Sequence, residues 1–348
     1  MTSILFVDDE ANVLEGLRDM LRRERRRWKM TFAEGGAAAV HLLAEEEFDV
    51  VVCDMRMPVI DGSVVLFEAR REQPGACRVV LSGQTDRESM LRSVRLTHRF
   101  LAKPCDPNEL HSTIESLLAL VELLPNEHVR RAVGSITALP SQTDVHETAL
   151  ATVANPECLP ADVAAIARLD PAIAANVLRI GNSGFFGAGR PVATVEEATE
   201  AIGADALRAP ELATALFDGE YERDASYPLD LRATAEHSLR VGDAVAAAVP
   251  DDEAAFAVGF LHDIGRLVLA ETEPELLREV LAEAEARSCG PHVIERERLG
   301  VTDAEMGAYL LGLWGLPEPI VAALADHGCP GEPKGALARA IRAAEAPR

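Results

Sequence analysis

A histidine and an aspartate stand side by side in "GFLHDIGRLVL", residues 259–269, where apolar residues begin to recur at helical spacing. One imidazole and one carboxylate in the same turn can reach the same divalent ion, as in metal-dependent hydrolases. We therefore take His262 and Asp263 as candidate metal ligands.

A second group could do phosphoryl chemistry. It combines three carboxylates, a hydroxyl and an ammonium: Asp8, Asp9, Asp54, Ser82 and Lys103. Clustered carboxylates repel one another and favour a hard cation such as Mg²⁺, which takes oxygen ligands. An aspartate beside such an ion can attack a phosphoryl group, while the ion, the lysine and the hydroxyl share the charge of its oxygens.

The elements that must position this second group are short apolar runs separated by stretches of helical pattern. The runs predict five strands: "ILFV" (4–7), "KMTFA" (29–33), "DVVVC" (49–53), "RVVLS" (78–82) and "RFLA" (99–102). Strands that alternate with helices predict a doubly wound α/β fold with a five-stranded parallel sheet. Functional groups gather at the carboxyl ends of such strands, which is where all five polar residues fall.

Residues 1–120 resemble the receiver domain of two-component response regulators, which has a flavodoxin-like fold. The motifs that carry the resemblance are "VDDE", "VVCDMRMPVIDG", "VLSGQ" and "FLAKP". The resemblance implies that Asp54 is the phosphoacceptor. It also implies that Asp9, Asp54 and the backbone carbonyl of Arg56 bind Mg²⁺, with Asp8 assisting in part through water.

The same resemblance assigns roles to three further positions. Ser82 and Lys103 would hold the phosphoryl group and take part in the transfer. Phe100 stands where the family has an aromatic switch residue that turns inward on phosphorylation, and Ser82 would act with it in that switch.

The second half of the chain has no convincing strand alternation. From about residue 126 apolar residues recur at three- and four-residue spacing, as in "ADVAAIARL", and Pro and Gly break the pattern at intervals. These features predict an all-α domain. We expect a receiver over residues 1–120, a helical linker over 121–135 and the all-α output domain over 136–348.

This second half resembles the HDOD domain, the HD-related output domain. The stretches that match are "IARLDPAIAANVLRIGNSGFFG" (166–187), "VEEATEAIGADALR" (195–208), "EHSLRVGDAVA" (236–246), "FLHDIGRLVL" (260–269) and "ERLGVTDAEMGAYLLGLWGLPEPIVAALADH" (297–327). The resemblance implies an HD-like helical fold in which the remainder of a metal-dependent phosphohydrolase site survives.

The resemblance implies that His237, which precedes His262 by 25 residues as suits two antiparallel helices that face one ion, joins His262 and Asp263 as a metal ligand. Beyond these three residues the site departs from active HD phosphohydrolases. Where enzymes that cut cyclic dinucleotides carry further histidines, this chain offers other candidates: Asp303, Asp326 and His327. A bridging Glu falls at Ala233, and the last ligand of the fold can only be Glu345.

Three interpretations of this site stay open: a retained polar cluster without catalysis, a bound metal without turnover, and hydrolysis. Carboxylates also bind metals, so the substitutions do not exclude an ion. An aspartate before a helix can also cap it. Loss of the imidazole-rich shell that activates water favours the first interpretation. We therefore do not expect this domain to bind a second metal in addition to the Mg²⁺ of the receiver.

Composition limits the partners. The formal net charge of −23 opposes binding to a phosphate backbone, and no DNA-reading helix is recognisable. The six Cys are scattered, which suits a reducing cytoplasm. No apolar run is long enough to span a membrane, and "MTSILFVDDE" turns acidic too soon for a signal peptide.

We therefore expect a cytoplasmic response regulator whose partners are a sensor histidine kinase and an unidentified downstream signalling protein, with no nucleic acid and no membrane. A homodimer stays open. The alternative is a phosphorylation-controlled HD-type phosphodiesterase that acts on a nucleotide second messenger.

Overall fold

The computed structural model describes residues 2–83, 93–184, 186, 190–217 and 227–345. The chain divides into two compact units, which are described separately. Met1–Thr137 with Ser183–Phe185 make up the first, and Ala138–Asn182 with Phe186–Arg348 the second.

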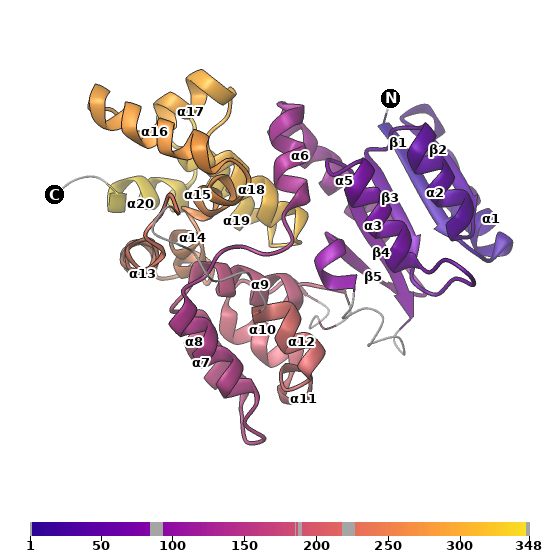
Figure 1. Ribbon diagram of the computed structural model, residues 1–348, viewed down its shortest axis with the longest axis horizontal. Helices are drawn as coiled ribbons and strands as arrows, with labels where there is room; N and C mark the ends of the chain where they lie inside the picture. The colour runs from indigo at the N-terminus through magenta and orange to yellow at the C-terminus, as the bar shows by residue number, and fades with distance from the viewer. Residues whose placement is uncertain (1, 84–92, 185, 187–189, 218–226, 346–348) are drawn as a thin grey trace. The chain divides into compact units, whose positions relative to one another are not determined.

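The first unit is a five-stranded parallel sheet in the order β2-β1-β3-β4-β5, so the α/β fold expected from the sequence is confirmed (Figure 1). Its strands are β1 (Thr2–Asp8), β2 (Trp28–Glu34), β3 (Val50–Asp54), β4 (Cys77–Gly83) and β5 (Arg99–Lys103). The central strand β3 is buried at every position, because helices cover both faces of the sheet and water reaches neither.

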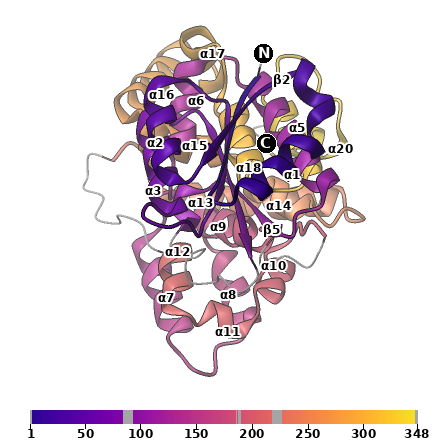
Figure 2. The same ribbon diagram turned by 90° about the vertical axis from the view of Figure 1, so that its right-hand side faces the viewer.

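Helices α1 and α5 cover one face of this sheet and α2 and α3 the other (Figure 2). The helices and 3₁₀ turns of the unit are α1 (Ala11–Met20), η1 (Arg22–Arg26), α2 (Gly36–Glu45), α3 (Gly62–Glu72), η2 (Val94–Leu96), α5 (Pro107–Leu123) and α6 (Glu127–Ser135). Asp61 and Asp106 accept backbone N–H hydrogen bonds at the starts of α3 and α5, so a side chain satisfies the first-turn donors of each helix.

Helix α6 belongs to this first unit and is attached by a buried arginine. Arg78, at the amino end of β4, is fully buried and donates to the carbonyl oxygen of Gly134 in α6 at 2.7 Å. It also donates to the carbonyls of Leu96 and Ala76, so backbone oxygens from several segments accept from its guanidinium.

The second unit is helical throughout the residues that the structure describes, which confirms the predicted all-α domain. Its helices are α7 (Thr143–Val153), α8 (Pro160–Ala167), α9 (Pro171–Gly181), α10 (Val195–Ile202), α11 (Ala204–Leu207), α12 (Pro210–Phe217), α13 (Leu231–Ala248), α14 (Ala255–Phe260), α15 (Ile264–Thr272), α16 (Pro274–Arg287), α17 (Pro291–Leu299), α18 (Asp303–Leu313), α19 (Glu318–His327) and α20 (Ala336–Glu345).

Close backbone approach holds the centre of this unit together. Helix α18 is buried along its whole length, and α15 packs directly against it. A Cβ atom at Gly265 of α15 would lie 1.8 Å from the carbonyl oxygen of Asp303, so only glycine fits at this contact. Within the described ranges no helix is long and apolar enough to cross a membrane.

Candidate functional site

The carboxyl ends of β1, β3 and β5 bring three of the predicted residues into direct contact. Lys103 donates from Nζ to Oδ2 of Asp8 at 2.7 Å and lies 2.5 Å from Oδ1 of Asp54. Both carboxylates are buried, whereas the lysine side chain is 29% exposed. A single ammonium thus balances two buried carboxylates at the edge of the sheet.

Backbone amides orient the remaining oxygens of the two aspartates. Glu10 N donates to Asp8 Oδ1 at 3.0 Å, and Arg56 N donates to Asp54 Oδ2 at 2.8 Å. The loop after β3 folds back tightly, because a Cβ at Gly62 would lie 2.2 Å from the carbonyl oxygen of Asp54.

The charges of this cluster shift its protonation equilibria. Burial raises the pKa of Asp54, although the hydrogen bond and charge of Lys103 oppose the shift. Burial alone would lower the pKa of Lys103, but its hydrogen bonds to Asp54 and Asp8 outweigh that effect and leave the pKa raised. The ammonium is therefore firmly charged, and the carboxylate beside it is more basic than an exposed aspartate.

The residues here fit the hard cation that the receiver resemblance implies. Asp9 is half-buried directly after Asp8 at the end of β1, so three carboxylates stand at one edge of the sheet. Oxygen donors of this kind are those that Mg²⁺ takes, and Arg56 follows Asp54 closely enough for its amide to bind that side chain.

Two further predicted residues lie on the neighbouring strands. Ser82 is in β4 and pairs with Ala102 of β5, but its side chain lies outside the part of the chain that is described. Phe100 is buried in β5, opposite Val80. The strands therefore place both positions near the edge where Lys103 is found.

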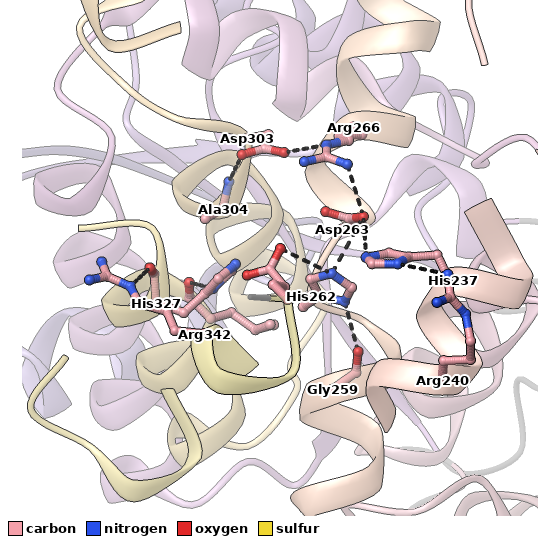
Figure 3. A network of polar contacts seen from close by, with 12 residues as sticks. His237, Arg240, Gly259, His262, Asp263, Arg266, Asp303, Ala304, His327 and Arg342 are labelled. Atoms are coloured by element: carbon pink, nitrogen blue, oxygen red, sulfur yellow. Dashed lines mark hydrogen bonds and ion pairs between the residues drawn. The ribbon is translucent and has the colours of Figure 1, made fainter. Parts of the chain in front are cut away.

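The second unit assembles the other predicted group around one carboxylate. His237 comes from α13, and His262 and Asp263 from the turn between α14 and α15 (Figure 3). Asp263 Oδ2 lies 3.6 Å from His237 Nε2 and 3.4 Å from His262 Nε2. Asp263 precedes α15 but makes no capping hydrogen bond, so its carboxylate serves this cluster and not the helix end.

His262 is held in one orientation. It is almost completely buried, and its Nδ1 lies 2.8 Å from the carbonyl oxygen of Gly259, to which Nδ1–H can only donate. That hydrogen bond leaves the lone pair on Nε2. This atom has no hydrogen-bond partner among the described residues, although it lies 3.6 Å from Oε1 of Glu345.

Arg266, which the sequence analysis did not single out, completes the cluster. It contacts Asp263 Oδ2 at 3.1 Å and Asp303 Oδ2 at 3.0 Å, and so links α15 to α18 (Figure 3). Its spacing of three residues from Asp263 was the available signal, because such residues are neighbours on a helix. Glu295, whose Oε2 accepts from Asp303 N at 2.9 Å, gave no comparable signal within the charged run "ERER".

The remaining candidates divide into two groups. His327 is buried with its ring 6.0 Å from that of His262, and its Nδ1 donates to Leu324 O at 2.6 Å. Asp326 lies elsewhere: its Oδ2 accepts from the amides of Lys334 and Gly335 in the loop before α20. Ala233, where a bridging Glu would stand, is exposed on α13.

Electrostatics distinguish the members of this cluster. Burial lowers the pKa of His237 and of His327. Burial alone would also lower the pKa of His262, but the charges of Asp263 and Glu345 outweigh it and raise the pKa.

Burial and the charge of Asp303 raise the pKa of Glu295 to about 9. The charge of Asp263, followed by that of Asp303, raises the pKa of Arg266. The buried charges are thus arranged around a permanent guanidinium cation.

Two family models match the chain, one in each of the two compact units. The model of the response regulator receiver domain matches residues 4–115, so the first unit is a receiver and the chain is a response regulator. The model of the HDOD domain matches residues 139–330, more than half of the 348 residues. The chain belongs to the HDOD family, with a receiver domain at its amino-terminal side, as its sequence motifs predicted.

Similar proteins include transcriptional regulators that match this chain over part of its length. The hydrogenase transcriptional regulatory protein HoxA of Cupriavidus necator is 31% identical over 128 residues, which are 36% of this chain and 26% of that protein. The transcriptional regulatory protein GlrR of Escherichia coli strain K12 is 31% identical over 134 residues, 37% of this chain and 29% of that protein. The chain spans between about a quarter and a third of the length of the curated relatives it matches.

Two solved structures are among those similar to this chain. The MmoQ response regulator from Methylococcus capsulatus is 28% identical and covers 60% of this chain and 83% of its own, with a TM-score of 0.49. The signal receiver domain of an HD domain-containing protein from Pseudomonas fluorescens Pf-5 is 28% identical and covers 34% of this chain and 94% of its own, with a TM-score of 0.32.

Proposed function

We propose that this response regulator accepts a phosphoryl group on Asp54 and passes the signal to its helical domain, which acts by binding a downstream protein and not by hydrolysis. The observation that carries the first part is the position of Lys103. Its ammonium contacts Asp8 and Asp54 at once and stands where the oxygens of an incoming phosphoryl group would need a cation.

The step itself needs little from the protein beyond position and charge. Oδ1 of Asp54 attacks the phosphorus and forms a new P–O bond, while the bond to the donor breaks and its electron pair stays on the leaving atom, which is nitrogen for a phosphohistidine and oxygen for acetyl phosphate. Asp8, Asp9, Asp54 and the Arg56 carbonyl would hold Mg²⁺, which would supply positive charge beside the phosphoryl oxygens. Lys103 moves from Asp54 to the phosphoryl group, and Ser82 provides a hydroxyl beside it.

Labelling with a small phosphodonor tests the assignment. The full chain with acetyl phosphate and Mg²⁺ should gain one phosphoryl group by intact-mass measurement, and Asp54→Asn should gain none. Asp61→Asn is a matched control, because Asp61 is on the same loop but only caps α3. Equal labelling of Asp54→Asn and the parent would exclude Asp54 as the acceptor.

The inference that the helical domain does not hydrolyse a phosphodiester rests on how its carboxylates are used. Asp303 is paired with Arg266 and accepts from the amide of Ala304, and Asp326 accepts two backbone amides of the loop before α20, so both carboxylates already have other partners. A pair of ions that activates a water between them therefore lacks ligands. We expect no turnover of cyclic dinucleotides with Mn²⁺, Fe²⁺ or Mg²⁺. Steady hydrolysis that Asp263→Ala abolishes would establish the phosphodiesterase instead.

The polypeptide chain after β5 connects the receiver to the helical domain, and we expect the effect of phosphorylation to pass along it. Phe100 is in β5, which leads into α5 and then into residues 121–135. Phosphorylation can shift a conformational equilibrium only through different contacts in its two states. Hydrogen exchange with and without a beryllofluoride mimic should therefore change at Phe100 and over 121–135. Unchanged exchange at both would contradict this route.

The expected partners follow from the receiver. A sensor histidine kinase in the cytoplasm would supply the phosphoryl group, and the acidic chain would not bind nucleic acid. A pulldown from native cells, with the parent and Asp54→Asn compared, should recover a downstream protein whose amount depends on phosphorylation. Recovery of DNA that is lost with added salt would instead indicate a transcription factor.

A further inference from the structure

The receiver holds a histidine–carboxylate group that takes no part in phosphoryl transfer. It consists of Glu24 in η1 and of His111 and Glu115 in α5. One carboxylate oxygen from each glutamate and one ring nitrogen of His111 all lie within 4.8 Å of one another. When an ion such as Zn²⁺ binds nitrogen and oxygen at about 2.0–2.2 Å, its tetrahedral ligand atoms lie roughly 3.3–3.5 Å apart. Small side-chain movements would therefore bring these three groups onto one ion.

Two of the three groups come from one face of a helix. His111 and Glu115 are four residues apart on α5, and residues at that spacing are neighbours on a helix surface. Glu24 approaches from a different element, and its Oε1 lies 3.4 Å from Nε2 of His111. A nitrogen–oxygen hydrogen bond is shorter, at about 2.7–3.2 Å. The separation fits two ligands of one ion better than it fits a donor and its acceptor.

Arg27 orients both carboxylates through one oxygen each. Its Nη1 donates to Oε2 of Glu24 at 3.3 Å, and its Nη2 donates to Oε2 of Glu115 at 3.0 Å. The Oε1 atoms of both glutamates stay available to another partner. Carboxylates that bind a metal are commonly hydrogen-bonded by an outer shell of this kind. Because one guanidinium faces two carboxylates, the group keeps a net negative charge.

One of these oxygens needs a partner. Glu115 Oε1 is shielded from solvent and has no hydrogen-bond partner among the described residues. A buried acceptor that is left unsatisfied is unfavourable, and more so when it carries charge. The ion pairs of Arg27 engage only the Oε2 atoms, so they do not account for this oxygen. A cation bound between the two glutamates and His111 would satisfy it.

The surroundings select the class of cation. Glu24 stands within an arginine-rich turn whose other arginines are exposed: Arg22, Arg23, Arg25 and Arg26. Their repulsion disfavours a cation that is held by charge alone, such as Mg²⁺ or Ca²⁺. An imidazole nitrogen with carboxylate oxygens suits a borderline cation such as Zn²⁺.

Trp28 forms a wall beside the histidine and gives the site a local reporter. The indole is buried and stacks on the ring of His111, with centroids 5.4 Å apart. Trp28 pairs with Thr2 at the amino end of the sheet, whereas Asp54 is the last residue of β3 at the carboxyl end. The group is therefore distinct from the carboxylates that would hold Mg²⁺ for phosphoryl transfer.

We propose that the receiver binds one divalent cation of the Zn²⁺ class through Glu24, His111 and Glu115, and that Arg27 positions the two carboxylates for it. Three protein ligands leave a fourth position for water. The ion would join η1 to α5. This site goes beyond phosphorylation of Asp54 and does not depend on it.

Quenching of tryptophan fluorescence by Co²⁺ in the full chain tests the proposal. Metal-free protein is titrated at about pH 8, where imidazoles are mostly neutral, with excess Mg²⁺ present to occupy the carboxylates around Asp54. Co²⁺ should quench Trp28 saturably because the ion binds the imidazole on which the indole stacks. Zn²⁺, which does not quench, should restore the fluorescence. In equilibrium dialysis the parent should hold one more Zn²⁺ per chain than Glu115→Gln.

The variants locate the ion. Glu115→Gln keeps the shape of the side chain and the contact between Trp28 and His111, but it should weaken Co²⁺ binding at Trp28 at least about 10-fold, because even outer-shell changes weaken metal sites about 10- to 100-fold. Glu115 is partly exposed, so this variant should stay folded. His41→Ala is the matched control, because His41 pairs with only one carboxylate, Glu45, on α2. It should bind as the parent does.

Arg27→Met tests the positioning role. Removal of a positive charge alone would tighten the binding of a cation, whereas loss of the orienting hydrogen bonds should weaken it. We expect binding about 10-fold weaker than in the parent. Equal or tighter binding by Arg27→Met would overturn the role of the guanidinium. Absence of saturable quenching in the parent, equal quenching in the parent and Glu115→Gln, or its loss in His41→Ala would overturn the site itself.

Discussion

The receiver and the helical domain each hold two buried carboxylates with one basic side chain, and the two arrangements are close in geometry. Lys103 lies 2.7 and 2.5 Å from Asp8 and Asp54, and Arg266 lies 3.1 and 3.0 Å from Asp263 and Asp303. Both basic side chains are 29% exposed. The exposure of the basic side chain therefore does not distinguish the two sites. The difference between them lies in the chemistry of the ammonium and the guanidinium.

Lysine and arginine differ in how readily they exchange partners. The ammonium of Lys103 is a compact point charge on a flexible stem, so it can leave Asp54 for a phosphoryl oxygen and still keep Asp8. The guanidinium of Arg266 is a planar fork whose Nε and Nη atoms bind two carboxylates from two helices. The lysine therefore suits a site where the positive charge has to change partners, and the arginine suits a site where it keeps the same two carboxylates.

The largest expected change in stability comes from removing the positive charge of Arg266. Arg266→Met leaves Asp263 and Asp303 buried without their cation, and removing one partner of a buried pair costs about 3 kcal/mol or more of unfolding free energy. Chemical denaturation should show the loss. Arg240→Met, an exposed arginine on α13, should change stability by no more than about 0.5 kcal/mol. Equal stability of the two variants would contradict the structural role of Arg266.

The second largest change in stability is expected where the backbones of α15 and α18 approach each other closely. Gly265→Ala places a Cβ against the carbonyl oxygen of Asp303, and overpacking of this kind costs about 2 kcal/mol. Gly16→Ala in α1 is the control, because nothing lies within 4 Å of its Cβ position. Alanine there should stabilise the chain by about 0.5–1 kcal/mol. Thermal unfolding measures both, and a neutral Gly265→Ala would show that α15 and α18 can separate without penalty.

Exchanging the type of cation in the receiver tests the comparison itself. Lys103→Arg keeps the positive charge between Asp8 and Asp54, so stability should change by less than about 1 kcal/mol. A fork bound to two carboxylates should release Asp54 less readily, and labelling by acetyl phosphate should slow at least about tenfold, or about 1.4 kcal/mol. Labelling at the parent's rate would mean that a mobile ammonium is not required.

Much of this could be predicted from the sequence, and what could not has a physical reason. Strand ends are local features, so Asp8, Asp54 and Lys103 could be placed together from periodicity alone, and the structure joins them. The helical site depends on which helices pack together, which periodicity does not specify. Arg266 was overlooked because its partner Asp303 is 37 residues away, and Asp326 was included because nothing in the sequence shows that it caps a loop.

The smallest expected effect concerns the cost of keeping Asp54 charged. Burial raises the pKa of this carboxyl, so the folded chain binds its proton more tightly than the unfolded chain does. Stability therefore falls as the pH rises from the ordinary pKa of aspartate, about 3.9, through the raised pKa of the folded state. Asp54→Asn lacks this loss and should be more stable than the parent at neutral pH, by no more than about 1 kcal/mol. The difference should shrink on acidification and reappear on return to neutral pH. Denaturation at several pH values in metal-free buffer measures it, and a less stable Asp54→Asn would mean that Lys103 overcompensates the burial of Asp54.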